Sequence, residues 1–202
     1  MDVIPTAIPG IDHKLLLTFD CLPMGGIPRH GITHIFGTEG VGVTSLAMSI
    51  ALHARWVLWI DLMHQMGDVG KQSDHVWVLR PPEAFNLLDV VNLTEDEAAF
   101  DLIVVDALEG LASGGVIKTS ERWGRVAAAS QDGPAVVVCG HQMFRPDVRR
   151  WYATAEATLR TYALLGIHLP HKGRAEVAWS SVCRYPAEVS YSIPARVREY
   201  VP

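Results

Sequence analysis

The chain has 202 residues, of which 49% are hydrophobic and 19% are charged, and its formal net charge is −5. This balance is typical of a globular domain with one sizeable core and excludes a disordered chain. An acidic net charge does not by itself indicate a nucleic-acid partner, so the distribution of the cations has to decide that question. We expect a single domain that covers residues 1–202.

The cysteine content and the hydropathy of the chain indicate the cellular compartment in which the protein is expected. The three cysteines, Cys21, Cys139 and Cys183, lie far apart and form no Cys-x-x-Cys pair. Such a sparse, odd set favours a reducing compartment and argues against a disulfide framework or a zinc site built from paired cysteines. Met1 is followed by the acidic Asp2, where a secretory signal needs positive charge, and charged residues interrupt the longest apolar run. We therefore expect a soluble, cytoplasmic protein.

Apolar strands alternate with helices along most of the chain. We predict strands at residues 32–36, 55–61, 76–79, 100–106 and 135–139, and helices at residues 44–54, 83–91 and 120–130. Continuous apolar runs of this kind are typical of parallel strands that are buried on both faces. Residues 175–182 and 187–193 alternate more and indicate antiparallel strands at the C-terminal end. The pattern predicts an α/β fold with a mostly parallel, twisted sheet flanked by helices.

A glycine-rich segment joins the first of these strands to the first helix. Its spacing matches a phosphate-binding loop, in which backbone N–H groups surround the phosphates, a lysine reaches the terminal phosphates and a hydroxyl holds Mg²⁺. Thr44 supplies the hydroxyl, but Val43 occupies the lysine position. The alternative is a glycine-rich turn that binds nothing. The predicted nucleotide-binding residues are Gly37, Thr38, Glu39, Gly40, Val41, Gly42, Val43, Thr44 and Ser45.

Polar residues follow three other strands. Asp106 ends the strand at 100–106, where it is predicted to hold Mg²⁺ together with Thr44; the alternative is an ordinary polar strand end. Gln142 follows the strand at 135–139 and is predicted to touch the terminal phosphate. Asp61 has no partner base, so it gives no case for a hydrolase. His168 and His171 have no second cluster of ligands, and we expect a surface turn there rather than a metal site.

In order and spacing, these motifs resemble the core of the RecA recombinases (the RecA/RadA superfamily). Residues 9–12 and 22–29 resemble the segment before the family's first core strand. Residues 37–45 resemble its Walker A motif, 103–108 its Walker B strand, 141–142 its Asn-Gln sensor and 151–155 the stretch after its second DNA loop. The resemblance covers residues 8–193. It implies a P-loop NTPase core, ATP and Mg²⁺ as cofactors, and a role in DNA recombination or repair.

The departures from the family pattern concern the chemistry of hydrolysis. Val43 replaces the Walker A lysine, and Met63 stands where the family has its catalytic glutamate. Ser180 and Val182 lie near the places of two lysines that reach a neighbour's nucleotide in bacterial members. A single cation supplied in trans contributes about 10³–10⁵ in rate. We therefore assign no catalytic residue, and we expect hydrolysis near background and nucleotide bound weakly or not at all. The family's N-terminal polymerisation segment and C-terminal domain are expected to be absent.

The same resemblance places two DNA-binding loops at residues 109–125 and 143–150. Cations in such loops follow the phosphates, while aromatic side chains such as Phe144 stack on the bases of a single strand. The alternatives are a solvated helix face for Arg122 and Arg125 and core packing for Trp151 and Tyr152, and for the two aromatics we expect core packing. The predicted DNA-binding residues are Lys118, Arg122, Arg125, Arg145, Arg149 and Arg150.

Three hypotheses follow. The leading one is a RecA-like recombination or repair protein, or a recombinase accessory factor, that has a degenerate ATP site. It binds single-stranded DNA, another recombinase or repair protein, or both, and it forms a homo- or hetero-oligomer. The second is an active DNA-dependent ATPase in which Lys71 or Arg145 replaces the missing lysine. The third is a protein-interaction module that binds neither nucleotide nor DNA.

Overall fold

The computed structural model describes residues 3–8, 11–12, 26–66, 73–81, 100–110, 116–146, 150–153, 156–181 and 188–192. For Lys118, Arg145 and Arg150 it describes only their place in a helix or strand. The predicted helix at 83–91, together with Lys71 and Arg149, lies outside these residues.

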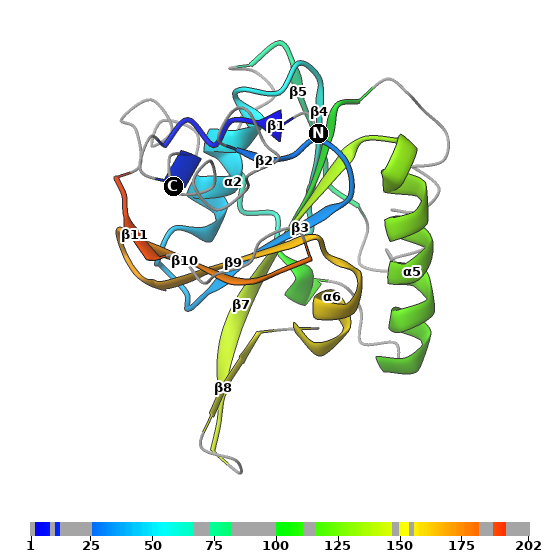
Figure 1. The fold of residues 1–202 in the computed structure, drawn as a ribbon. Coiled ribbons are helices and arrows are strands. Elements are labelled where there is room, and N and C mark those ends of the chain that lie inside the picture. Colours follow the sequence, from blue (N-terminus) through cyan, green and yellow to red (C-terminus); the bar gives the residue numbers. More distant parts are fainter. Residues whose placement is uncertain are drawn as a thin grey trace.

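Among the described residues, one sheet of nine strands forms the centre of the molecule, in the order β11-β10-β9-β3-β7-β6-β4-β5, with β8 paired to β7 (Figure 1). The inner strands are parallel, and the antiparallel pairs lie at the C-terminal edge and at β8. The strands are β3 (Ile32–Gly37), β4 (Val57–Asp61), β5 (Val76–Leu79), β6 (Leu102–Asp106), β7 (Ala135–Arg145), β8 (Arg150–Ala153), β9 (Leu165–His171), β10 (Arg174–Ser180) and β11 (Glu188–Ser190).

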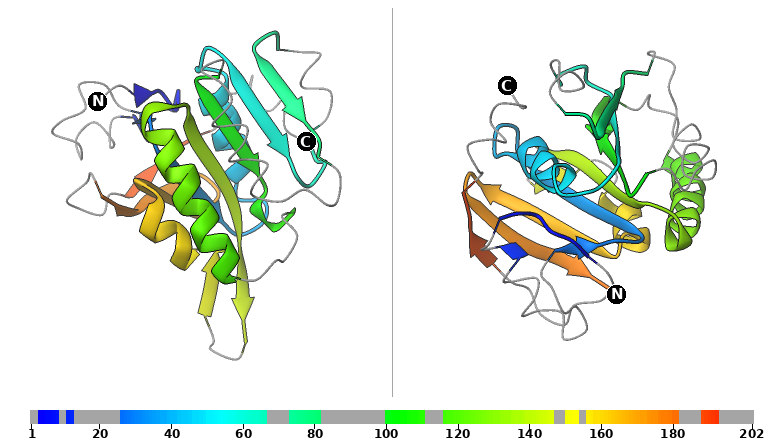
Figure 2. Two further views of the ribbon diagram at one scale, coloured as in Figure 1. Left: turned by 90° about the vertical axis from the view of Figure 1, so that its right-hand side faces the viewer. Right: turned by 90° about the horizontal axis from the view of Figure 1, so that it is seen from above.

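Helices cover both faces of this sheet. One face carries α2 (Val43–Ala51), and the other carries α5 (Val116–Asp132) and α6 (Glu156–Tyr162), as the turned views show (Figure 2). A short 3-10 helix, η1 (Leu108–Gly110), follows β6, and a small antiparallel pair, β1 (Val3–Ile4) and β2 (Ile27–Pro28), lies apart from the main sheet. No helix among the described residues is long and apolar enough to cross a membrane.

Burial explains why the central strands carry so few polar residues. Every residue of β3, β4 and β6 is buried, because helices pack on both faces. Successive side chains alternate between the faces: Val104 belongs to the core under α2, whereas Ile103 and Val105 belong to the core under α5. The predicted mostly parallel α/β sheet with an antiparallel C-terminal edge is confirmed.

Two predicted boundaries were wrong. The strand predicted to end at residue 139 continues to Arg145, because β8 returns antiparallel beside it and satisfies its backbone groups. The first DNA-binding loop was predicted at 109–125, but α5 begins at Val116, so Lys118, Arg122 and Arg125 lie on a helix.

The predicted surface turn at His168–His171 was also wrong, because these residues belong to β9. Pro170 has no N–H to donate to a ladder, and it lies just past the last pair that β9 makes with β3, Gly37↔Leu169. The pairing with β10 is irregular at the same place, so the strand tolerates a proline there.

Candidate functional site

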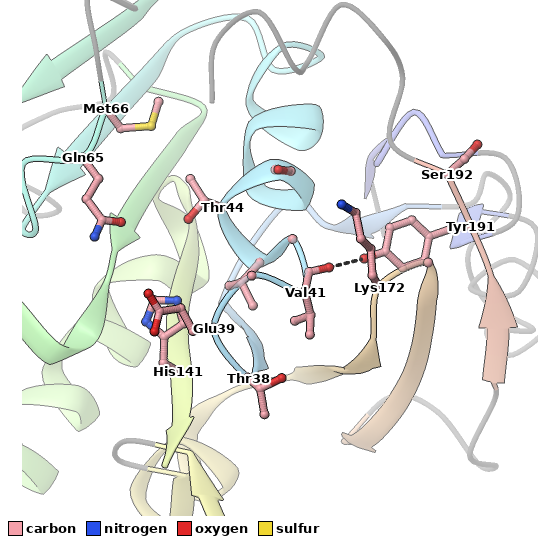
Figure 3. Close-up of a pocket in the computed structure, with 15 residues that line it drawn as sticks. Thr38, Glu39, Val41, Thr44, Gln65, Met66, His141, Lys172, Tyr191 and Ser192 are labelled. Atoms are coloured by element: carbon pink, nitrogen blue, oxygen red, sulfur yellow. Dashed lines mark hydrogen bonds between the residues drawn. The ribbon is translucent and has the colours of Figure 1, made fainter. Parts of the chain in front are cut away.

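The glycine-rich segment between β3 and α2 borders a cavity of about 660 Å³ (Figure 3). The loop lies at the carboxyl ends of the parallel strands, which is where open α/β sheets form their ligand sites. The cavity is lined by Thr38, Glu39, Gly40, Val41, Gly42, Val43, Thr44, Ser45, Gln65, Met66, His141, Lys172, Gly173, Tyr191 and Ser192.

Glycine is required at three places in this loop. Gly40 and Gly42 have φ angles of 78° and 106°, which side chains with a Cβ rarely adopt. At Gly37 a Cβ would lie 2.6 Å from the Leu169 carbonyl oxygen and 2.7 Å from Val41 Cγ2. Gly42 is the N-cap of α2 and caps it with no side-chain hydrogen bond. The loop therefore turns sharply and presents the start of a helix to the cavity, where N–H groups and the helix dipole favour an anion.

A hydroxyl and a carboxylate meet beneath the loop. Thr44 Oγ1 donates a hydrogen bond to Asp106 Oδ1 at 3.2 Å, which joins the first turn of α2 to the end of β6. Asp106 is only 5% exposed. Burial raises its pKa to about 6, Asp61 adds to the rise, and the Thr44 hydrogen bond opposes it. An arriving cation would stabilise the charged form of this carboxylate, and oxygen ligands of this kind suit Mg²⁺.

Asp61 lies directly beside Asp106 but has other partners. The two residues are paired in the β4–β6 register. Asp61 accepts hydrogen bonds from the backbone N–H groups of Gln65 at 2.9 Å and Met66 at 3.0 Å, and from Arg80 Nε at 3.2 Å. Gln65 and Met66 line the cavity, so Asp61 fixes the segment that forms one of its walls.

His141, on β7, lines the cavity and is paired with Glu109 of η1. Glu109 accepts from the His141 backbone N–H at 2.7 Å, and its other oxygen lies 3.4 Å from His141 Nδ1. The hydrogen bond with Glu109 raises the pKa of His141, and burial opposes this rise. Gln142 points elsewhere: its Oε1 is 3.0 Å from His168 Nε2, and it does not line the cavity. Strand alternation explains this difference, since neighbours on β7 face opposite sides of the sheet.

Comparison with known proteins shows which proteins this chain is similar to. No protein-family model matches the chain. Protein RecA of Thermus aquaticus is 32% identical over 120 residues, which are 55% of this chain and 33% of that protein. Protein RecA of Deinococcus radiodurans is 33% identical over 99 residues, which are 45% of this chain and 27% of that protein. The crystal structure of the RadB recombinase matches with a TM-score of 0.68 at 17% identity, covering 92% of this chain and 94% of that one.

These comparisons support a RecA/RadA-superfamily core for this chain. The matched part spans only about a third of the length of its curated RecA relatives, so the activity of the whole protein is a matter for proposal. The resemblance to RecA aligns the glycine loop with the Walker A motif and Asp106 with the Walker B aspartate. The chain brings these two together as the sequence predicted, through the Thr44–Asp106 hydrogen bond.

The structure shows the surroundings of two residues that depart from the RecA pattern. Val43 is 3% exposed and belongs to the hydrophobic core under α2, although it also borders the cavity. Met63, at the expected place of the catalytic glutamate, is 43% exposed in the turn after β4 and does not line the cavity.

Sequence reasoning missed Lys172 and Tyr191, which reach the RecA-like loop from the antiparallel edge of the sheet. Lys172 lies in the turn between β9 and β10, and Tyr191 follows β11. Tyr191 donates its hydroxyl to the Val41 carbonyl at 3.5 Å, and burial raises its pKa to about 12, so it remains a donor at neutral pH. The Lys172-Gly173 pair between two alternating segments was a turn signal, but no signal tied that turn to the loop.

The predicted DNA-binding residues fall into two groups. Arg145 of β7 and Arg150 of β8 are paired in register across a hairpin that projects from the sheet (Figure 1). Lys118, Arg122 and Arg125 lie on α5, where Arg122 is half-buried and Arg125 is exposed. The structure therefore brings the hairpin arginines together and places the others on a separate element.

Proposed function

We propose that this protein is a RecA-like protein of DNA recombination or repair, or an accessory factor of a recombinase, whose core binds a magnesium nucleotide and hydrolyses it slowly or not at all. One observation carries the nucleotide part of the proposal: Thr44 and Asp106 meet at 3.2 Å beside a glycine loop that borders a cavity. The identity to RecA proteins supports the recombination part.

Each part of the site has a defined role in binding. The backbone N–H groups of residues 40–44 and the start of α2 would hold the phosphates. Thr44 Oγ1 and Asp106 would hold Mg²⁺, which neutralises phosphate charge when it is bound. Gln65, Met66 and His141 close the cavity from the side of the neighbouring strands. The loop keeps these elements without its lysine, so affinity is expected to fall rather than vanish.

Hydrolysis requires a group that activates water, and the positions at which the resemblance places this chemistry do not supply one. Met63 carries no base. Glu109 already accepts the His141 backbone N–H at 2.7 Å, which holds its carboxylate against β7. Val43 offers no charge to the terminal phosphate. Together these features support binding without rapid turnover.

Isothermal titration of the purified chain with ATP, in the presence and absence of Mg²⁺, tests this proposal. We expect Mg²⁺-dependent binding that Thr44→Val weakens at least about tenfold, because Val keeps the shape but loses the oxygen. Thr161→Val is the matched control, since Thr161 is an exposed threonine on α6 whose hydroxyl donates to the Ala157 carbonyl of the same helix. The absence of any heat at high protein concentration would overturn the proposal.

A phosphate-release assay addresses the alternative of an active ATPase. We expect turnover near background with or without single-stranded DNA. A rate typical of a recombinase, abolished by Asp106→Ala, would contradict the proposal and support an active enzyme with a non-standard Walker A motif.

A second function, single-stranded DNA binding, is supported by the β7–β8 hairpin. The hairpin extends beyond the sheet, pairs Arg145 with Arg150, and exposes Met143 by 60% and Phe144 by 47% (Figure 1). A projecting hairpin that carries arginines at paired positions, together with exposed apolar and aromatic side chains, suits a strand whose phosphates bind cations and whose bases stack.

Fluorescence anisotropy with labelled single strands at several salt concentrations tests this function. Each phosphate contact contributes about 0.7 to the slope of log affinity against log salt. Replacing Arg145, Arg149 and Arg150 by Ala should therefore flatten the slope and weaken binding. A second variant replaces Arg122 and Arg125 by Ala, so that the contribution of the cations on α5 can be compared with that of the hairpin. If the hairpin variant binds as the wild type does, or the wild type never binds, the hairpin is not a DNA site and an interaction module becomes the better account.

A further inference from the structure

The turn between β9 and β10 stands beside the glycine loop because of how β9 pairs. β9 runs parallel to β3, and the last residue pair of the two strands is Gly37↔Leu169, where the loop begins. β9 ends two residues later, at His171, so Lys172 in the following turn lies at the same end of the sheet as the loop and lines the cavity with it. Gly173, with a φ of 81°, makes the turn that follows.

Tyr191 ties this turn to the loop. Its backbone N–H donates to the Gly173 carbonyl at 2.8 Å, and its hydroxyl donates to the Val41 carbonyl at 3.5 Å. A Cβ on Gly42 would lie 3.7 Å from the same hydroxyl. One residue thus links the turn to the loop through its backbone and its side chain, so the fold sets where the backbone of Lys172 lies relative to the loop.

Lys172 is the lysine of this cavity: among the described residues that line it, no other is a lysine or an arginine. Figure 3 shows Lys172 next to Tyr191 on one side of the glycine loop, while Thr44 and His141 lie on the other side. Ser45, the residue after the metal-binding threonine, also lines the cavity. A polyphosphate held by the loop would therefore have its metal at the Thr44 side and a cation at the Lys172 side.

We propose that Lys172 is the phosphate-binding cation of this site, supplied from the β9–β10 turn, and that it holds the end of the polyphosphate nearer the nucleoside. The proposal rests on the nucleotide-binding function proposed above. It explains how a loop with Val43 in place of lysine keeps charge for its ligand. It also agrees with slow hydrolysis, since a cation at the near end does not stabilise the charge that develops at the terminal phosphate.

Titration of the full chain with adenosine, ADP and ATP in the presence of Mg²⁺ tests this role. We expect Lys172→Ala to weaken the binding of ADP and of ATP by a similar factor of about tenfold or more, because a charge-assisted hydrogen bond is lost. The affinity for adenosine should not change. Lys172→Glu should weaken both nucleotides further, and Lys172→Arg should retain most of the affinity.

Arg55→Glu is the matched control for Lys172→Glu, because it changes the net charge equally. Arg55 is exposed between α2 and β4, at the opposite end of the strands from the loop, and its replacement should change affinity by less than about twofold. Thermal melts without ligand show whether each variant is folded, and Lys172 is exposed, so its variants should melt like the wild type.

The outcomes separate this proposal from the function on which it rests. If the wild type binds ADP, Thr44→Val weakens it and Lys172→Ala does not, the nucleotide site stands and the role of Lys172 is refuted. A loss confined to ATP would place the lysine at the terminal phosphate and contradict the position proposed. An equal loss for adenosine would show that the side chain does not act through phosphate. If the wild type binds no nucleotide, both proposals fail.

Discussion

Asp61 and Asp106 end neighbouring strands, are paired in register and are both buried, yet their surroundings differ. Asp61 accepts two backbone N–H groups and the Arg80 guanidinium. Asp106 faces the Thr44 hydroxyl, and its pKa is raised to about 6 by burial. Hydrogen-bond donors of the protein compensate the charge of Asp61. The charge of Asp106 is buried with fewer compensating groups, so it lowers the free energy of unfolding.

The difference separates an acid whose charge the fold compensates from one that is free to serve a ligand, as the proposed function requires. A buried carboxylate with several donors stabilises the segment that supplies them. A buried carboxylate with a raised pKa beside a cavity is a group that gains from an external cation. From sequence the two aspartates look alike, since each is an acid at the end of an apolar strand.

Removing Asp61 should produce the largest effect on folding. Asp61→Ala leaves the N–H groups of Gln65 and Met66 without their buried acceptor, which should lower the free energy of unfolding by about 3–4 kcal/mol. Urea denaturation followed by circular dichroism measures this change. Asp74→Ala, at an exposed acid before β5, should stay within about 0.5 kcal/mol of the wild type. A loss of similar size in both variants would show that Asp61 has no special role.

Replacing Asp106 should act in the opposite direction. At pH 7 Asp106→Asn removes a charge that burial disfavours, and the rise in pKa from 3.8 to about 6 corresponds to a gain of about 2–3 kcal/mol in unfolding free energy. At a pH between 3.8 and about 6, the folded state keeps a proton on Asp106 that the unfolded state releases. Wild-type stability should therefore fall as the pH rises from about 4 to about 6, and the variant should lack this fall. Equal pH profiles would contradict the assignment.

A smaller effect is expected at Glu109, the acid that is paired with His141. It raises the pKa of His141 above its usual 6.5, so their pairing stabilises the fold at pH 6 and is lost as the pH rises through the raised pKa. Glu109→Gln keeps an acceptor for the His141 N–H and should cost about 1 kcal/mol at pH 6 and less at pH 9. Urea midpoints at the two pH values measure the gap; one that widens with pH would refute this pairing.

Sequence was sufficient for the parts of the fold that depend on local pattern. The buried strands β3, β4 and β6 were predicted because they are apolar throughout, and the loop, Thr44 and Asp106 because motif order fixed their places. The alternation along β7 would also have separated His141 from Gln142 had the strand been extended past residue 139.

The missed features depend on pairing between distant segments. β9 was mistaken for a turn because Pro170 and two histidines obscure its pattern, and only its pairing with β3 reveals a strand. Lys172 and Tyr191 reach the loop because that pairing and the following hairpin bring them there. The partners of Asp61 include Arg80, which comes from beyond the next strand. No local pattern encodes such contacts.

The most direct test of the account is an experimental structure of the protein with ATP and Mg²⁺. We predict phosphate density on the backbone N–H groups of residues 40–44, with Mg²⁺ about 2.0–2.1 Å from Thr44 Oγ1 and held by Asp106 directly or through a water. Asp61 should keep its bonds to Gln65 and Met66 unchanged. An empty loop at saturating nucleotide, or a metal bound to Asp61 instead of the Thr44–Asp106 pair, would contradict the account.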